Sequence, residues 1–150
     1  MSIRVPPVAQ VLLCGLLGWG LSTLFPSPQI SGQWLLFPAV LLSGGGLVLL
    51  TFAVGAFVRA KTTVNPLDPE SAEELVTSGL FRFSRNPMYL GMVLVLTGWV
   101  ILLGAWSAML APALFIWIMT VLQIKPEERS LQLKFGDHFS EYRTRTRRWI

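Results

Sequence analysis

The distribution of charged side chains constrains the fold of this chain more than any other feature. The stretch from Val5 to Val58 contains no Asp, Glu, Lys or Arg, and neither does the stretch from Asn86 to Ile124. Charged residues make up only 13% of the chain, about half of the roughly 25% that is usual in soluble domains. A water-soluble core cannot absorb such long uncharged runs. The sequence therefore predicts a polytopic membrane protein and excludes a soluble enzyme.

The two uncharged stretches divide into four predicted membrane spans. A bilayer core about 30 Å thick needs roughly 20 apolar residues per helix. The predicted spans are residues 5–25, 34–58, 87–103 and 107–124, followed by a tail at 125–150. Because only three residues separate the last two spans, these should form an antiparallel helical hairpin. The predicted fold is therefore a single all-α integral membrane domain.

The glycines at positions 44, 45 and 46 stand together in the second predicted span. Small residues let two helices in a membrane approach closely. They cannot cradle a phosphate, since they lie in mid-span without a basic partner. We therefore expect this triplet to pack against another helix.

The charges also orient the predicted spans. All twelve Lys and Arg residues fall on one side of a four-span topology whose two termini lie together. The opposite connectors, residues 26–33 and 104–106, carry no charge. By the positive-inside rule both termini and the loop at 59–86 are cytoplasmic. The sequence thus predicts an integral protein of a bacterial-type inner membrane with its polar segments inside.

The tail at 125–150 has the pattern of an amphipathic helix. Pro126 followed by two glutamates is typical of a helix start. An apolar stripe then recurs at intervals of four, four and three, interrupted by Gly136; it consists of Leu131, Phe135, Phe139 and Tyr142. The basic run at 143–148 and Trp149 suit the lipid headgroup layer. We expect a helix along the membrane interface that packs over the cytoplasmic ends of the spans.

Polar side chains concentrate at the cytoplasmic ends of the third and fourth predicted spans. The hairpin should bring together Arg82, Arg85, Asn86 and Tyr89 with Gln123, Glu127, Glu128 and Arg129. Opposite charges, an amide and an aromatic ring at one place suit a zwitterionic ligand with one end near lipid. Purely structural roles also fit: arginines can anchor a span, glutamates can complement a helix dipole, and a tyrosine can sit in an aromatic belt.

Several other kinds of site are excluded. Cys14 is the single cysteine and His138 the single histidine, so no disulfide framework, histidine metal cluster or Ser-His-Asp triad is available. No dinucleotide fingerprint or phosphate loop is present. Membrane topology explains the net charge of +4 better than a nucleic-acid partner does. We expect neither a metal ion nor a nucleic acid as a partner.

Four segments together carry a resemblance to a known family. They are Leu75-Val-Thr-Ser-Gly79, Arg85-Asn-Pro-Met-Tyr-Leu-Gly91, Glu127-Glu128 and Phe135-Gly136. Over about residues 59–149 the chain resembles the isoprenylcysteine carboxyl methyltransferases, which are related to the phospholipid N-methyltransferases. The resemblance implies a membrane-embedded methyltransferase that uses S-adenosyl-L-methionine, bound in a cytoplasm-facing pocket, and a lipophilic acceptor.

The resemblance also implies which residues form the site. The implied cofactor contacts are Asn65, Glu74, Leu75, Val76, Phe81, Arg85, Asn86, Pro87, Met88, Tyr89, Glu127 and Glu128. Asn86 stands where the family commonly has histidine. Gln123 stands where the eukaryotic enzymes are expected to have a substrate-contacting arginine, with Arg129 nearby, so these two are the implied substrate contacts. No catalytic base is named, because a carboxylate acceptor would need none.

The sequence leaves the methyl acceptor and two other functions open. Acceptor candidates are an isoprenoid or fatty carboxylate, a thiol, a lipid amine or another hydrophobic small molecule. Asn86 and Gln123 favour an accessory membrane protein that binds cofactor without catalysis. A nicotinamide-dependent lipid reductase is a further alternative, since some membrane sterol reductases share a similar helical end. The Glu127-Glu128 pair beside the Arg-Asn-Pro-x-Tyr segment favours methyl transfer.

Overall fold

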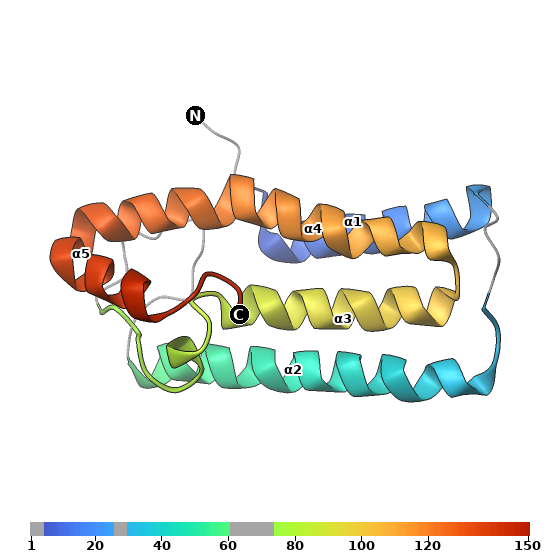
Figure 1. Cartoon of the computed structure of the whole chain (residues 1–150), viewed down its shortest axis with the longest axis horizontal. Coiled ribbons are helices and arrows are strands. Elements are labelled where there is room, and N and C mark those ends of the chain that lie inside the picture. The colour runs from blue at the N-terminus through green and yellow to red at the C-terminus, as the bar shows by residue number, and fades with distance from the viewer. Residues whose placement is uncertain (1–4, 26–29, 61–73) are drawn as a thin grey trace.

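The computed structural model describes residues 5–25, 30–60 and 74–150, and every regular element in these ranges is a helix. Long helices run side by side along one axis (Figure 1). They are α1 (Pro7–Leu24), α2 (Leu36–Arg59), α3 (Pro87–Leu103), α4 (Leu110–Ile118) and α5 (Lys125–Arg145). Short helices precede three of them: η1 (Gln33–Leu35), η3 (Gly79–Arg82) and η4 (Trp106–Met109). The predicted all-α class is confirmed.

Apolar length supports the membrane prediction. In the described residues, three helical stretches are long and apolar enough to cross a bilayer: Pro7–Leu24, Gln33–Arg59 and Trp106–Arg145. The apolar helix α3 is shorter, at 17 residues. Only 11% of the apolar window in the α2 stretch is buried inside the protein, so its large apolar side chains face outward. Such an outward apolar surface is typical of contact with lipid.

The helices α2 and α3 pack closely through small residues. A Cβ atom at Gly46 would lie 2.6 Å from the carbonyl oxygen of Gly91, and one at Gly91 would lie 2.8 Å from that of Gly46. Since neither backbone has room for a side chain, this crossing requires glycine on both helices. A Cβ at Gly44 or Gly45 would meet no atom within 4 Å. The predicted close approach is therefore confirmed at Gly46 alone.

The predicted hairpin of α3 and α4 is also present. Gly104 ends α3, and η4 leads the chain back into α4, which runs antiparallel to α3 (Figure 1). The helix α1 packs against both members of the hairpin, with Gly18 close to Ala111 and Val100. The inward face of α1 is formed by Pro7, Gln10, Cys14, Gly18 and Ser22.

The tail helix differs from the prediction at its start. A π-helix, η5 (Met119–Ile124), joins α4 to α5, so the chain passes from α4 into α5 without a loop. Pro126 lies in the first turn of α5, and in an α-helix its ring would clash with the carbonyl four residues earlier. That carbonyl belongs to Leu122, inside the widened π-turn, which accommodates the proline. Pro126 therefore marks the change from π-helix to α-helix and not the start of a separate helix.

Gly136 reverses the direction of α5. Its backbone angles are φ 50 and ψ −121, a conformation that favours glycine. The first part of α5 extends away from the bundle, and the part after Gly136 returns toward the start of α3 (Figure 1). We call this end of the bundle, where α3 begins and α5 lies, the charged end. The described charged residues all belong to segments that meet there.

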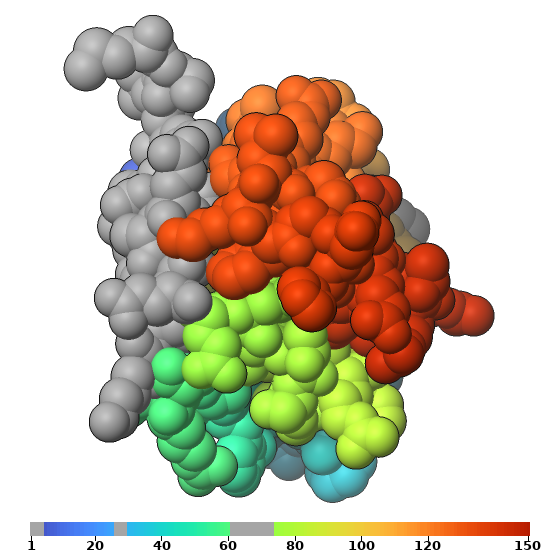
Figure 2. Space-filling view, turned by 90° about the vertical axis from the view of Figure 1, so that its left-hand side faces the viewer, coloured from blue at the N-terminus to red at the C-terminus, as the bar shows by residue number. Residues whose placement is uncertain are grey.

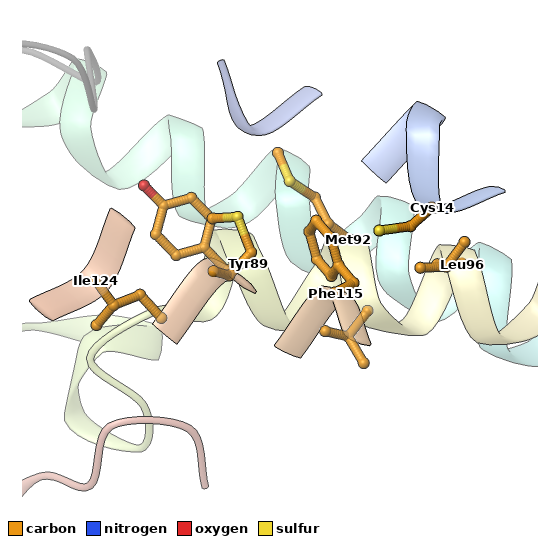
Figure 3. Close-up of a cluster of buried hydrophobic side chains, with 8 residues drawn as sticks. Cys14, Tyr89, Met92, Leu96, Phe115 and Ile124 are labelled. Atoms are coloured by element: carbon orange, nitrogen blue, oxygen red, sulfur yellow. The ribbon is translucent and has the colours of Figure 1, made fainter. Parts of the chain in front are cut away.

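Two apolar clusters support this end. One contains Tyr89, Met92, Phe115 and Met119 between α1, α3 and α4, with Cys14 deeper in the bundle (Figure 3). The other lies under the returning part of α5 and consists of Ala53, Val76, Phe81, Phe139 and Tyr142. The last two members of the predicted tail stripe, Phe139 and Tyr142, are therefore buried, and the first two, Leu131 and Phe135, are partly buried against the same cluster. Figure 2 shows α5 lying against the segment that follows residue 74.

Candidate functional site

A carboxylate with two hydrogen-bond donors lies at the junction of α3 and α5. The hydroxyl of Tyr89, in the first turn of α3, donates to Glu127 Oε1 over 2.7 Å. Gln123 Nε2, one turn before Glu127, donates to the same oxygen over 2.5 Å. Tyr89 is 6% exposed and Gln123 is 2% exposed. Two buried donors thus hold a half-buried acidic group in one orientation.

A second carboxylate lies between two arginines. Glu128 Oε1 accepts from Arg85 Nη2 over 2.7 Å, and Glu128 Oε2 accepts from Arg148 Nη2 over 2.7 Å. The side chains of Arg85 and Glu128 are 10% and 11% exposed. Burial alone would raise the pKa of Glu128, but the hydrogen bonds and charges of Arg148 and Arg85 outweigh it and hold that pKa below its usual value. Glu128 is therefore ionised at neutral pH.

The C-terminal segment ties the start of α3 to α5. The backbone N–H of Arg85 donates to the carbonyl of Arg147 over 3.0 Å. Asn86 Nδ2 donates to the carbonyl of Arg148 over 2.9 Å, although Asn86 is the N-cap residue of α3. Trp149 Nε1 donates to the hydroxyl of Thr120 over 3.2 Å. We call residues 146–149 the C-terminal strap.

The tail packs over the end of the bundle, and its last residues make contacts that the sequence did not predict. The guanidinium of Arg148 binds Glu128. Trp149 packs against the cluster that contains Tyr89. A buried carboxylate attracts the arginine more strongly than the exposed surface does, because its charge needs compensation.

The structure brings together some of the implied cofactor contacts and separates others. Arg85, Asn86, Tyr89, Glu127 and Glu128 meet at the junction described above. Val76, Phe81 and Met88 belong to or pack against the apolar cluster under α5, and Pro87 is buried at the start of α3. Glu74 and Arg129 are exposed, and Leu75 is half-buried. Asn65 lies outside the described residues.

A cavity of about 580 Å³ lies beside the returning part of α5. Its lining consists of Leu75, Thr77, Arg82, Phe135, His138, Glu141, Tyr142, Arg145 and Thr146. The Tyr142 hydroxyl donates to the carbonyl of Phe81 over 2.7 Å. Burial raises the pKa of Tyr142, against the opposing charge of Arg85, so this phenol stays protonated as a donor. Small-molecule sites commonly have about 300–1,000 Å³, so the cavity has a suitable size.

Sequence reasoning missed most of this lining and the strap. His138, Glu141, Tyr142 and Arg145 are spaced by three, one and three residues, which places them on one helix face. The sequence shows this spacing, but the direction in which this helix face points depends on the reversal of α5 at Gly136. Arg148 lies beyond the helix, where no periodicity indicates which way its side chain points. Among the described residues, no group of three metal-ligating side chains is present.

The chain has relatives among known proteins. Residues 33–138 match the model of the phospholipid methyltransferase family, and the chain belongs to that family. It is 40% identical over 63 residues to an uncharacterized protein of Haemophilus influenzae, which covers 42% of this chain and 100% of that protein. It is 35% identical over 69 residues to the protein-S-isoprenylcysteine O-methyltransferase of Schizosaccharomyces pombe. That match covers 46% of this chain and only 29% of the yeast enzyme.

No solved structure matches the chain significantly. The family match includes α2, α3, α4 and most of the candidate site, from η1 to His138. The resemblance inferred from the motifs is thereby confirmed. The family match and the yeast relative point to a membrane methyltransferase related to the phospholipid and isoprenylcysteine enzymes.

Proposed function

We propose that this protein transfers a methyl group from S-adenosyl-L-methionine to a lipophilic acceptor at the charged end of the bundle. One observation carries the proposal. Glu127 receives two buried donors, Tyr89 and Gln123, directly beside the Arg85–Glu128 pair, in a chain of the phospholipid methyltransferase family. Acidic and basic groups held this firmly at one place are typical of a zwitterionic ligand's site.

The residues present fit the cofactor. Its ammonium and ribose hydroxyls need acceptors, which the Glu127 carboxylate supplies. Its carboxylate needs a donor, and Arg85 Nε is buried without an acceptor among the described residues. An arginine that retains a donor can bind a carboxylate strongly. Leu75, Phe81 and Met88 offer apolar contacts of the kind that adenine needs.

The protein contributes to the reaction by positioning the two reactants and by excluding water. Adenosylmethionine supplies an activated methyl carbon, which bonds to the acceptor's lone pair while the carbon–sulfur bond breaks and its electron pair stays on sulfur. Tyr89 and Gln123 hold Glu127 in place for binding, and the strap covers the start of α3. Alignment of two reactants can contribute about 7–11 kcal/mol to such a displacement. An amine or hydroxyl acceptor must also release a proton, which the water-facing charged end can receive.

The proposed topology has four spans, α1, α2, α3 and the α4–η5 helix, with both termini and the site cytoplasmic. The connectors opposite the charged end carry no Lys or Arg, which supports this orientation. α5 then begins at the membrane surface. Its first part, before Gly136, points along the axis of α4 (Figure 1). The segments that contact the membrane interface would therefore be the returning part of α5 and the strap.

The proposed acceptor is lipophilic, such as a lipid amine, a thiol, or an isoprenoid or fatty carboxylate. The outward faces of the helices are apolar, so an acceptor dissolved in the bilayer can approach between them. Each methylene that leaves water contributes about 0.8 kcal/mol. Transfer should therefore favour long-chain acceptors over short, water-soluble ones with the same head group.

Binding of adenosylhomocysteine to the purified protein tests the proposal. We expect Glu127→Gln to weaken binding about ten- to hundredfold, because a charged hydrogen-bond partner contributes about 1.5–3 kcal/mol. Asp137→Asn is the matched control, since Asp137 is an exposed carboxylate on α5 that does not line the cavity. Binding of reduced nicotinamide instead of adenosylhomocysteine would contradict the proposal. Incubation with labelled adenosylmethionine and a membrane lipid extract would then identify the methylated product.

A further inference from the structure

The cavity beside the returning part of α5 has an unpaired positive charge in its lining. Arg82 is exposed, and its guanidinium has no ion pair or hydrogen bond with any residue that the structure describes. Arg145 also lines the cavity, but it pairs with Glu141, and these two charges cancel. The lining, with two arginines and one glutamate, therefore keeps one positive charge. Such a cavity favours an anion as its ligand.

The uncharged polar groups of the lining can donate hydrogen bonds. Thr77 and His138 are exposed, and neither side chain has a partner among the described residues. A hydroxyl, an imidazole N–H and a guanidinium together are donors of the kind that phosphate oxygens accept. Leu75 and Phe135 add an apolar part to the wall. With a volume of about 580 Å³, the cavity has room for a phosphate that carries an organic substituent.

The cavity lies at the level where α2 ends. The ring of Phe57, in the last turn of α2, contacts the ring of Phe81 edge to face, with centroids 5.1 Å apart, and Arg82 follows Phe81 directly. α2 ends at Arg59, and the stretch that contains it is long and apolar enough to cross a bilayer. Phe83, beside Arg82, is 77% exposed. An exposed aromatic ring next to an arginine, at the end of a membrane-spanning helix, is typical of the lipid headgroup layer.

The cavity is distinct from the charged groups of the candidate site. Its lining includes neither Arg85 nor Glu127. Thr146 contacts both places, because it lines the cavity while its carbonyl accepts from Arg85 Nη1 over 2.8 Å. Leu75 is the one lining residue that is also a proposed cofactor contact. The cavity thus offers a second site, beside the one proposed for adenosylmethionine.

We propose that this cavity binds the phosphate group of an anionic phospholipid from the leaflet at the charged end, and that this lipid is not the methyl acceptor. The guanidinium of Arg82 pairs with the phosphate, and Thr77 and His138 donate to its other oxygens. The headgroup layer presents phosphodiesters to the cavity at a high local concentration. Because Glu141 is already paired with Arg145, the lining has no free carboxylate for the cation of a zwitterionic head group.

Lipid binding to the whole chain, purified in a nonionic detergent, tests the proposal. The first probe is dimyristoylphosphatidylglycerol, which is anionic. Dimyristoylphosphatidylcholine has the same chains and a phosphate but a zwitterionic head group, and glycerol 3-phosphate has the phosphate without the chains. Native mass spectrometry over a titration counts the bound molecules and gives each affinity. Arg82→Gln removes the unpaired charge, and Arg143→Gln is the matched control, because Arg143 is exposed on α5 and does not line the cavity.

For the wild type and Arg143→Gln we expect phosphatidylglycerol to bind more tightly than phosphatidylcholine, and glycerol 3-phosphate to bind more weakly than either lipid. In Arg82→Gln the affinity for phosphatidylglycerol should fall about three- to tenfold, since solvent partly screens an exposed guanidinium. Because no described residue binds the Arg82 side chain, the unfolding temperature of Arg82→Gln should match that of the wild type. Loss of folding would then not imitate loss of binding.

Each of four results would overturn the inference. Equal affinities for the two lipids would show that the site does not select an anion. Equal losses in Arg82→Gln and Arg143→Gln would show a general attraction to the basic surface. Glycerol 3-phosphate that binds as tightly as phosphatidylglycerol would assign the cavity to a free phosphate ester. Displacement of phosphatidylglycerol by adenosylhomocysteine would place the cofactor in the cavity.

The failure of the proposed function has a different signature, because lipid binding does not depend on methyl transfer. If adenosylhomocysteine does not bind the wild type, the cofactor assignment at Glu127 fails. The lipid site would stand in that case, provided that phosphatidylglycerol binds selectively and Arg82→Gln weakens its binding. If adenosylhomocysteine binds but Arg82→Gln behaves like the wild type toward all three probes, only the lipid site fails.

Discussion

The hydroxyl of Tyr89 and the carboxylate of Glu127 are 2.7 Å apart although 38 residues separate them in the chain. The tyrosine ring belongs to the apolar cluster of the bundle, whereas Glu127 lies in the first turn of α5. This hydrogen bond therefore couples the core of the bundle to the helix that carries both glutamates. A change at either residue should alter the site without removing the core.

Tyr89→Phe removes the hydroxyl and keeps the ring in its apolar cluster. Because Glu127 then loses one of its two donors, we expect affinity for adenosylhomocysteine to fall about tenfold or more. Titration calorimetry on the detergent-purified protein measures this affinity. Tyr142→Phe is the matched control, since that hydroxyl donates to Phe81. If only Tyr142→Phe weakened binding, the cofactor would lie in the cavity beside α5 instead.

Arg148→Ala removes one of the two arginines that bind Glu128. Arg148 is about one-third exposed, so solvent screens part of the interaction, and Arg85 still pairs with the carboxylate. We expect the free energy of unfolding to fall by about 1 kcal/mol, measured by thermal unfolding in nanodiscs. Arg147→Ala removes an exposed arginine one position earlier and should have little effect. Equal losses in both variants would show that the Glu128 pair is not the cause.

The pH dependence of stability should report the same carboxylate. The pKa of Glu128 in the folded protein lies below its usual value of 4.5. Its contribution to stability is therefore fully present above about that pH, and it is lost as the pH falls through the lower folded pKa. Arg148→Ala removes a charge that lowers this pKa, so acid unfolding should begin at a higher pH than in the wild type. An unchanged acid midpoint would contradict this assignment.

The sequence predicted the membrane class, the hairpin and the pairing of Tyr89 with the Glu127 region, because these follow from local patterns. Charge-free runs identify the helices, and a three-residue connector forces two helix ends together. The sequence did not predict that Gly136 reverses α5, because a glycine can also lie within a continuous helix and merely lower its helix propensity. Without that reversal, neither the strap contacts of Arg148 nor the cavity could be anticipated.

The orientation in the membrane can be tested with reporter fusions. All described charged residues gather at one end of the bundle, so a reporter fused after Ile150 should be cytoplasmic. A reporter inserted between α1 and α2, in the connector at 26–33, should be periplasmic. Alkaline phosphatase and green fluorescent protein fusions at both sites give opposite readouts. If both sites gave the same signal, the connector and the C-terminus would lie on the same side of the membrane. The proposed topology, which has three spans between them, would then be wrong.

The contact of Gly46 with Gly91 predicts different effects for neighbouring glycines in α2. Gly46→Ala would place a methyl group 2.6 Å from the Gly91 carbonyl oxygen, a backbone atom that cannot move without shifting α3. Overpacking of this kind costs about 1–3 kcal/mol, and we expect a lower unfolding temperature. Gly44→Ala adds a methyl group where no atom lies within 4 Å. There the better helix propensity of alanine should raise stability by up to about 1 kcal/mol. Thermal unfolding of both variants in the same nanodiscs makes the comparison, and equal stability would mean that α2 and α3 do not cross at Gly46.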